Sequence, residues 1–159
     1  MKKFITFSLL FLAYQLNLIS QIQFKIESPL SISGNYNFTT TADPGVGPAG
    51  WTATPDLNDT ANAVIDTLMF VEDGTVGTNP QGNPLSQEGC FPLTNNLTGK
   101  IAVIWRNTCE FGAKIINAQN AGARAVIIIN REPGLVNMAP GSDGAFCTIP
   151  AVFVDSADG

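Results

Sequence analysis

Histidine is absent from this chain of 159 residues, and only three cysteines are present. A serine or cysteine nucleophile needs a nearby base, most often histidine, so a hydrolytic site of that type is disfavoured. Zinc sites combine cysteine and histidine ligands, often as Cys-x-x-Cys pairs. The three cysteines here form no such pair, so a zinc site is not expected. The sequence therefore predicts no metal, no cofactor and no catalytic activity in this domain.

Basic residues are also few. There are 8 Lys and Arg against 13 Asp and Glu, a formal net charge of −5 that becomes −7 if Lys2 and Lys3 are removed with a leader. Because the remaining bases form no cluster, neither nucleic acid nor an anionic membrane surface is an expected partner. A composition of 45% hydrophobic and 13% charged residues argues against general disorder, and the length suits one domain.

Residues 1–20 are typical of a secretory signal peptide. Lys2 and Lys3 precede an apolar stretch at residues 4–14, and the small residue Ser20 marks the expected cleavage point. The apolar stretch is short for a membrane span, which disfavours the alternative of an uncleaved anchor. We expect a mature domain at residues 21–159 that has no membrane segment and is secreted, either extracellular or at the cell surface.

Residues 99–130 predict a β-α-β unit. Residues 100–105 and 123–130 are apolar runs short enough for strands, and the second run shows no polar alternation, so both of its faces should be covered. Residues 107–122 between them have helical spacing. Two buried strands joined by a helix of this length indicate a right-handed crossover between parallel strands.

The predicted helix has one apolar face and recognisable ends. Asn107 and Glu110 approximate a capping box at its start, and Gly122 stands where a left-handed residue would end it. The residues of the apolar face are Phe111, Ile115, Ala118 and Gly122, flanked by Ile116 and Ala121.

The remainder of the chain predicts short strands separated by long loops. Alternating Ile22, Phe24 and Ile26 indicate a half-buried first strand, and a second is expected around Tyr36 and Phe38. Further strands are expected at residues 64–71 and 149–154.

The segment at residues 42–62 is rich in turn residues and predicts a surface loop anchored by Trp51. Its Gly45–Gly50 stretch formally matches Gly-x-Gly-x-x-Gly. Pro48 interrupts it and no helix can follow, so we do not expect a dinucleotide site.

In an oxidising compartment the three cysteines predict one disulfide. Cys90 and Cys109 are the expected pair because each lies in a loop flanking the strand at residues 100–105. Cys147 would then be a buried or externally paired thiol.

Short motifs follow one another in a fixed order along residues 89–159. They are Gly89-Cys90-Phe91-Pro92-Leu93, Gly99-Lys100-Ile101-Ala102-Val103, Arg106-Asn107-Thr108-Cys109-Glu110-Phe111 with Lys114, Asn117-Ala118-Gln119-Asn120-Ala121-Gly122-Ala123, Ile149-Pro150-Ala151-Val152 and Ala157-Asp158-Gly159. Their order resembles the protease-associated (PA) domain, and the strands and loops at residues 21–88 resemble its lead-in more loosely. Asn107 stands where the family commonly has glycine.

The resemblance implies an α+β fold: a β-rich PA-type domain, described as an open β-barrel or sandwich, with a β-α-β crossover helix. The family continues past the Asp158-Gly159 motif, so we expect the chain to be a fragment or a truncated product, with any catalytic domain in a missing carboxyl-terminal part. A complete chain would leave a sheet edge open and favour self-association.

The resemblance also implies a non-catalytic module that binds a peptide or a partner protein domain. PA domains are associated with secreted peptidases and sorting receptors, where they affect substrate access or bind protein segments. The loop that carries the arginine is implicated in ligand contact, which indicates Arg106, Asn107, Thr108 and Glu110 here. The alternative for Arg106 is an internal ion pair with an acid such as Glu110, and we expect Lys114 to be a solvated helix residue.

Two other functions remain open on the sequence. One is a purely structural or adhesive β domain. The other is an independent secreted hydrolase that uses carboxylates, although the spacing of the acids singles out no pair. The candidate acids are Glu72, Asp73, Glu88, Asp143 and Asp155.

Overall fold

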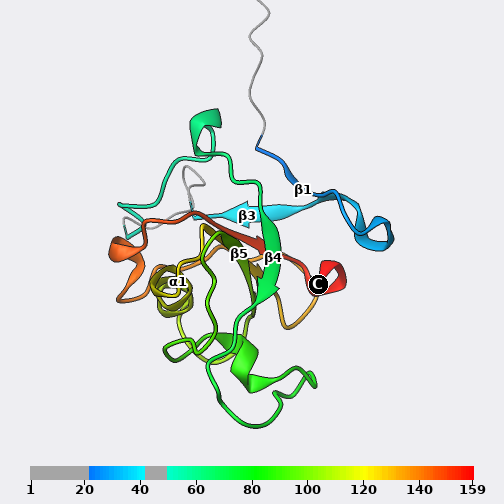
Figure 1. Cartoon of the computed structure of the whole chain (residues 1–159), viewed down its shortest axis with the longest axis vertical. Helices are drawn as coiled ribbons and strands as arrows, with labels where there is room; N and C mark the ends of the chain where they lie inside the picture. Colours follow the sequence, from blue (N-terminus) through cyan, green and yellow to red (C-terminus); the bar gives the residue numbers. More distant parts are fainter. Residues whose placement is uncertain (1–21, 42–49) are drawn as a thin grey trace, which may run out of the picture.

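A five-stranded mixed sheet forms the centre of the domain (Figure 1). The computed structural model describes residues 22–41 and 50–159. The strand order is β3-β7-β6-β5-β4, in which β4 to β7 run parallel and β3 is antiparallel to β7. The strands are β3 (Phe38–Thr40), β4 (Thr67–Phe70), β5 (Lys100–Trp105), β6 (Ala125–Ile129) and β7 (Ala151–Val154).

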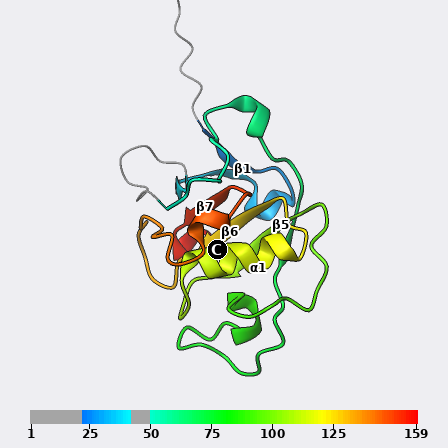
Figure 2. The same cartoon turned by 90° about the vertical axis from the view of Figure 1, so that its left-hand side faces the viewer.

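The helix α1 (Phe111–Asn120) connects β5 to β6 and lies against one face of the sheet (Figure 2). Ile115 and Ala118 on its apolar face are completely buried, as the spacing predicts. All five residues of β6 are buried, because this central strand is covered on both faces. The expected α+β fold with a β-α-β crossover is confirmed.

A small hairpin covers part of the opposite face of the sheet. It consists of β1 (Phe24–Ile26) and β2 (Gly34–Tyr36), which pair antiparallel. Phe24 and Phe38 pack there against a second apolar cluster that includes Val103 and Ile127. The single strand predicted around Tyr36 and Phe38 is therefore two strands, β2 and β3, in different sheets.

Short 3-10 helices lie within the loops: η1 (Leu30–Ile32), η2 (Thr60–Asn62), η3 (Leu85–Glu88), η4 (Gly144–Phe146) and η5 (Ser156–Asp158). Trp51 anchors its loop as predicted, since its indole is buried and donates to the Met138 carbonyl at 2.9 Å. The Gly45–Gly50 stretch, except Gly50, and the predicted signal peptide lie outside the described residues. Within the described ranges, no helix is long and apolar enough to cross a membrane.

The helix begins later than the sequence suggests. The N-cap residue is Glu110, not Asn107, and the predicted capping box is wrong because both side chains have other partners. Asn107 donates to Glu88 at 2.8 Å, and the Glu110 carboxylate accepts from the Ser142 N–H at 2.9 Å. The end is as predicted: Gly122 has φ +94° two residues after α1, a conformation that favours glycine.

The predicted disulfide between Cys90 and Cys109 is present. Cys90 lies two residues after the end of η3, and Cys109 lies in the loop that precedes α1, so the bond joins these two segments. Cys147 is a buried free thiol whose pKa is raised to about 11, first by burial and then by Asp143.

Replacing both Cys90 and Cys109 with serine should lower the free energy of unfolding by about 3 kcal/mol. The bridge closes a loop of 19 residues in the unfolded chain, and the loop-entropy relation gives this magnitude. Urea unfolding of the oxidised and double-serine proteins measures the difference. Non-reducing peptide mapping should recover Cys90 joined to Cys109, and a Cys147 adduct would contradict the pairing.

Candidate functional site

The carboxyl ends of β5, β6 and β7 meet at one edge of the sheet, and a polar residue directly follows each strand. These residues are Arg106, Asn130 and Asp155. In parallel sheets this edge is where side chains from adjacent loops converge, and it is the usual place for a ligand.

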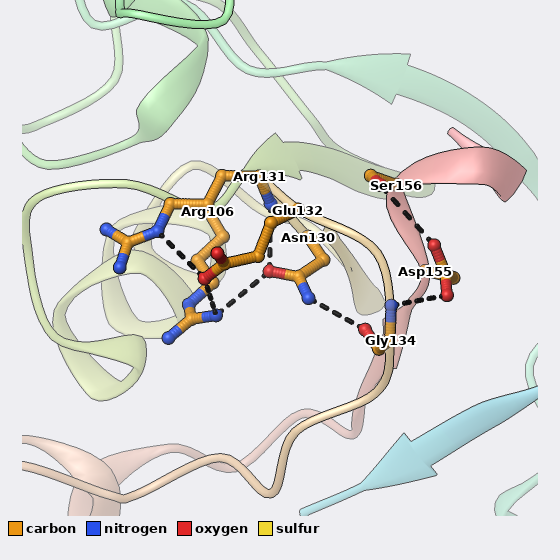
Figure 3. A network of polar contacts seen from close by, with 7 residues as sticks. All are labelled: Arg106, Asn130, Arg131, Glu132, Gly134, Asp155 and Ser156. Carbon is orange, nitrogen blue, oxygen red and sulfur yellow. Dashed lines mark hydrogen bonds and ion pairs between the residues drawn. The ribbon is translucent and has the colours of Figure 1, made fainter.

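Arg106 is held in a fixed position at this edge (Figure 3). One of its guanidinium nitrogens donates to Asn130 Oδ1 at 2.9 Å and lies 3.9 Å from Glu132 Oε1. The guanidinium also lies 5.7 Å from the ring centre of Phe111 and 5.9 Å from that of Phe153. Such contacts with aromatic rings suit a planar cation and restrict its rotation.

The charge on Arg106 is balanced mainly by Glu132. Among the described residues Arg106 does form the internal ion pair that was the alternative to ligand binding, but the acid is Glu132 and not the example given, Glu110. Burial and then the nearby Arg131 lower the pKa of Arg106, while Glu132 partly opposes that shift. An arginine remains protonated under such a shift, so the edge keeps a partly buried cation.

Asn130 connects Arg106 to the loop at residues 131–134. Its side chain is buried, accepts from Arg131 N–H at 2.8 Å and donates to the Gly134 carbonyl at 2.7 Å. Asp155 closes the other side by accepting from Gly134 N–H at 2.6 Å. The family motifs did not indicate Asn130, and Asp155 was named only among the candidate acids of the hydrolase alternative. A polar residue directly after a wholly apolar strand is the signal that could have identified both.

A pocket of about 230 Å³ opens beside Arg106. Three of the four predicted site residues, Arg106, Asn107 and Glu110, line it. Thr108 is not among the lining residues, and its hydroxyl donates to Glu88 at 3.2 Å. The full lining is Arg106, Asn107, Cys109, Glu110, Phe111, Ala139 and Gly141.

The pocket wall combines a cation, a carboxylate, an aromatic ring and the start of α1. The side chain of the N-cap residue Glu110 does not cap the helix, and the first turn of α1 adds positive potential beside Arg106. Gly141 has φ +61° and allows the opposite loop to approach the Glu110 carboxylate closely. This arrangement can hold carbonyl or carboxylate oxygens, and no described group of three or more His, Cys, Asp or Glu residues could hold a metal ion.

Beneath the pocket lies a buried polar cluster centred on Lys114 and Glu88. Lys114 is fully buried, so the expectation of a solvated residue is wrong. Its ammonium donates to the Glu88 carbonyl at 2.5 Å and the Trp105 carbonyl at 3.3 Å, and lies 3.6 Å from Cys90 Sγ.

The Glu88 carboxylate fixes the pocket loop from the other side. It is 2% exposed and accepts from Asn107 at 2.8 Å, Thr108 at 3.2 Å and Asn79 at 3.3 Å. A buried carboxylate normally requires such partners. The loop that carries the four predicted residues is therefore anchored by Glu88, which precedes Asn107 by 19 positions and Thr108 by 20.

Burial lowers the pKa of Lys114 to about 8, and the negative charges of Glu88 and then Asp73 partly oppose that shift. The folded protein therefore releases this proton near pH 8, whereas the unfolded chain retains it up to the ordinary value of 10.5. Between these values the unfolded state binds more protons at this group, so the contribution of Lys114 to stability should rise with pH.

We expect Lys114→Met to remove this pH dependence. Between pH 8 and 10.5 the free energy of unfolding of the wild type should rise by about 3 kcal/mol more than that of Lys114→Met. Urea unfolding at pH values that span this window gives both slopes. Lys25→Met is the control, because Lys25 is exposed and its loss should leave the wild-type slope unchanged. Equal slopes for the wild type and Lys114→Met would show that Lys114 is not the source of the pH dependence.

Comparison with known proteins identifies the domain. The family model of the PA domain matches residues 67–159. Aminopeptidase YwaD of Bacillus subtilis is 37% identical over 99 residues, which cover 59% of this chain and 22% of that protein. Signal peptide peptidase-like 2 of Arabidopsis thaliana is 39% identical over 70 residues, which cover 43% of this chain and 13% of that protein.

A solved structure is also similar. The aminopeptidase from Aneurinibacillus sp. strain AM-1 shares 31% identity with a TM-score of 0.45, over 60% of this chain and 20% of that one. In each of these relatives the matched region is less than a quarter of the whole protein. Because the family model covers more than half of the sequence, the chain belongs to the PA domain family.

Proposed function

We propose that this domain is a non-catalytic binding module that receives an extended segment of a peptide or partner protein in the pocket beside Arg106. The observation that carries the proposal is the position of the Arg106 guanidinium in the pocket wall. Its contacts to Asn130 and Glu132 use one of its terminal nitrogens. A guanidinium has five N–H donors, so others remain to bind oxygen atoms of a ligand.

The site is arranged in advance of binding. The two aromatic rings and Asn130 hold Arg106, and Glu88 holds the neighbouring loop through Asn107. A preorganised arginine loses less side-chain entropy when it binds a carbonyl or carboxylate, so more of the contact contributes to affinity. Phe111 and Ala139 give the pocket an apolar portion that suits a side chain of the same segment.

We further propose that the domain serves a peptidase by affecting access of substrate. Support comes from the relatives, which include an aminopeptidase of Bacillus subtilis and a signal peptide peptidase-like protein. The chain spans only 22% and 13% of these two proteins, so their activities are not attributed to it. The leader-like residues 1–20 and the Cys90–Cys109 disulfide support a secreted or cell-surface location.

Substitution of Arg106 tests the binding proposal. Peptides selected from a phage-displayed random library on the wild-type domain should bind Arg106→Ala about tenfold more weakly or worse, because a charge-assisted hydrogen bond is lost. Fluorescence anisotropy of labelled peptides gives the dissociation constants.

Arg131→Ala is the matched control, because Arg131 pairs with the same Glu132 but does not line the pocket. It should bind within about twofold of wild type, since exposed ion pairs contribute little. Urea unfolding confirms that both variants fold. Unchanged peptide affinity in a folded Arg106→Ala protein would contradict binding beside Arg106, and a library that yields no binding peptide would favour a purely structural domain.

A further inference from the structure

The strand β4 forms one edge of the five-stranded sheet (Figure 1). All four of its residues are exposed, including three large apolar ones: Leu68 at 39%, Met69 at 38% and Phe70 at 39%. Edge strands in natural proteins are usually protected by charge, proline or a covering segment. This strand has the sequence Thr-Leu-Met-Phe and lacks both lysine and proline.

The backbone of β4 is open along only part of its length. The Val71 N–H donates to the Val103 carbonyl, and Val103 lies opposite Phe70, so the odd-numbered residues of this segment bond to β5. Because backbone groups alternate in direction along a strand, the N–H and C=O groups of Leu68 and Phe70 face away from β5. Beyond this point Asn95 covers the edge, because its amide donates to the Phe70 carbonyl and accepts from Glu72 N–H, both at 3.0 Å. The open edge therefore runs from Asp66 to the N–H of Phe70.

An antiparallel second copy matches this short edge. A two-fold axis at Leu68 places Leu68 opposite Leu68 of the second copy and Asp66 opposite Phe70 of the second copy. The paired leucines can exchange two backbone hydrogen bonds, and each Phe70 N–H can donate to the opposite Asp66 carbonyl. The Phe70 carbonyl, which Asn95 covers, is at the last position of this pairing and is not needed for these bonds, so Asn95 does not obstruct the second copy.

The side chains are also complementary under this symmetry. Leu68 and Phe70 point to the same face as Ile101 and Val103, opposite α1, and Phe70 stacks on Trp105 with ring centres 5.8 Å apart. Antiparallel pairing joins the two apolar stripes across the axis. Cross-strand apolar pairs of this kind stabilise sheets.

The charges near β4 favour the antiparallel arrangement. Near its start lie Lys100, which donates to Thr67 at 2.8 Å, and Arg124, which pairs with Asp66 at 3.3 Å. After its end come the acids Glu72 and Asp73. The two-fold brings the more basic end of each strand toward the acidic end of the other, whereas a parallel arrangement would bring like charges together.

We propose that the domain forms a two-fold dimer by antiparallel pairing of its β4 edges, centred on Leu68. A pairing of five residues on each side buries less surface than a standard interface. We therefore expect a weak dimer, with a Kd of about 10 μM or above.

Variants with one added cysteine test the register directly. Leu68→Cys should form a disulfide-linked dimer under mild oxidation, because opposite residues in a hydrogen-bonded pair have Cα atoms about 5.5 Å apart, within disulfide range. Val76→Cys is the matched control, since Val76 is 92% exposed and lies outside β4. Cross-linking of Leu68→Cys should be about tenfold faster or more, with mass spectrometry locating the bond at position 68.

A mixture of variants tests the symmetry. Asp66→Cys and Phe70→Cys should cross-link to each other faster than either links to itself, because the axis places these positions opposite one another. Sedimentation equilibrium should show weak association of the wild-type domain that is lost in Leu68→Lys, since two like charges would meet at the axis. Leu68→Cys cross-linking no faster than that of Val76→Cys would overturn the proposal, and so would a wild-type protein that stays monomeric at about 1 mM.

Discussion

The buried contact between Lys114 and the Glu88 backbone holds the pocket edge of this domain together. Lys114 belongs to α1 and Glu88 to η3. Lys114 also contacts the carbonyl group of Trp105, the last residue of β5. One ammonium group therefore ties three elements at the point where the chain leaves the sheet for the pocket. Burying that charge is unfavourable, and the negative charges of Glu88 and Asp73 reduce the penalty.

The disulfide and the polar contacts of Glu88 strengthen the same junction. Cys90 and Cys109 join the two loops covalently, and the Glu88 carboxylate joins them again through Asn107 and Thr108. The Arg106 loop consequently has little freedom on this side. On its other side Asn130 and the loop at residues 131–134 fix the guanidinium, so a ligand would meet a site that is already formed.

The sequence predicted what depends on local pattern and failed where distant partners decide. The apolar run of β6, the crossover helix, the left-handed Gly122 and the disulfide follow from spacing and residue type. The start of α1 could not be read in this way, because Glu110 is drawn to Ser142, which is 32 residues away. Lys114 looked like an ordinary solvated helix residue, since nothing in its sequence neighbourhood shows that its ammonium meets the carbonyl groups of Glu88 and Trp105.

The acid that pairs with Arg106 could not be identified from the sequence for the same reason. Glu110 is near in sequence and was the natural candidate, yet Glu132 follows the adjacent parallel strand and lies closer in space. In a parallel sheet, residues that follow neighbouring strands meet regardless of their separation in the chain. The carboxyl edge thus gathers the polar groups, while the lateral edge at β4 is apolar. None of the described pocket residues belongs to β4, so pairing at that edge would use different residues from those that line the pocket.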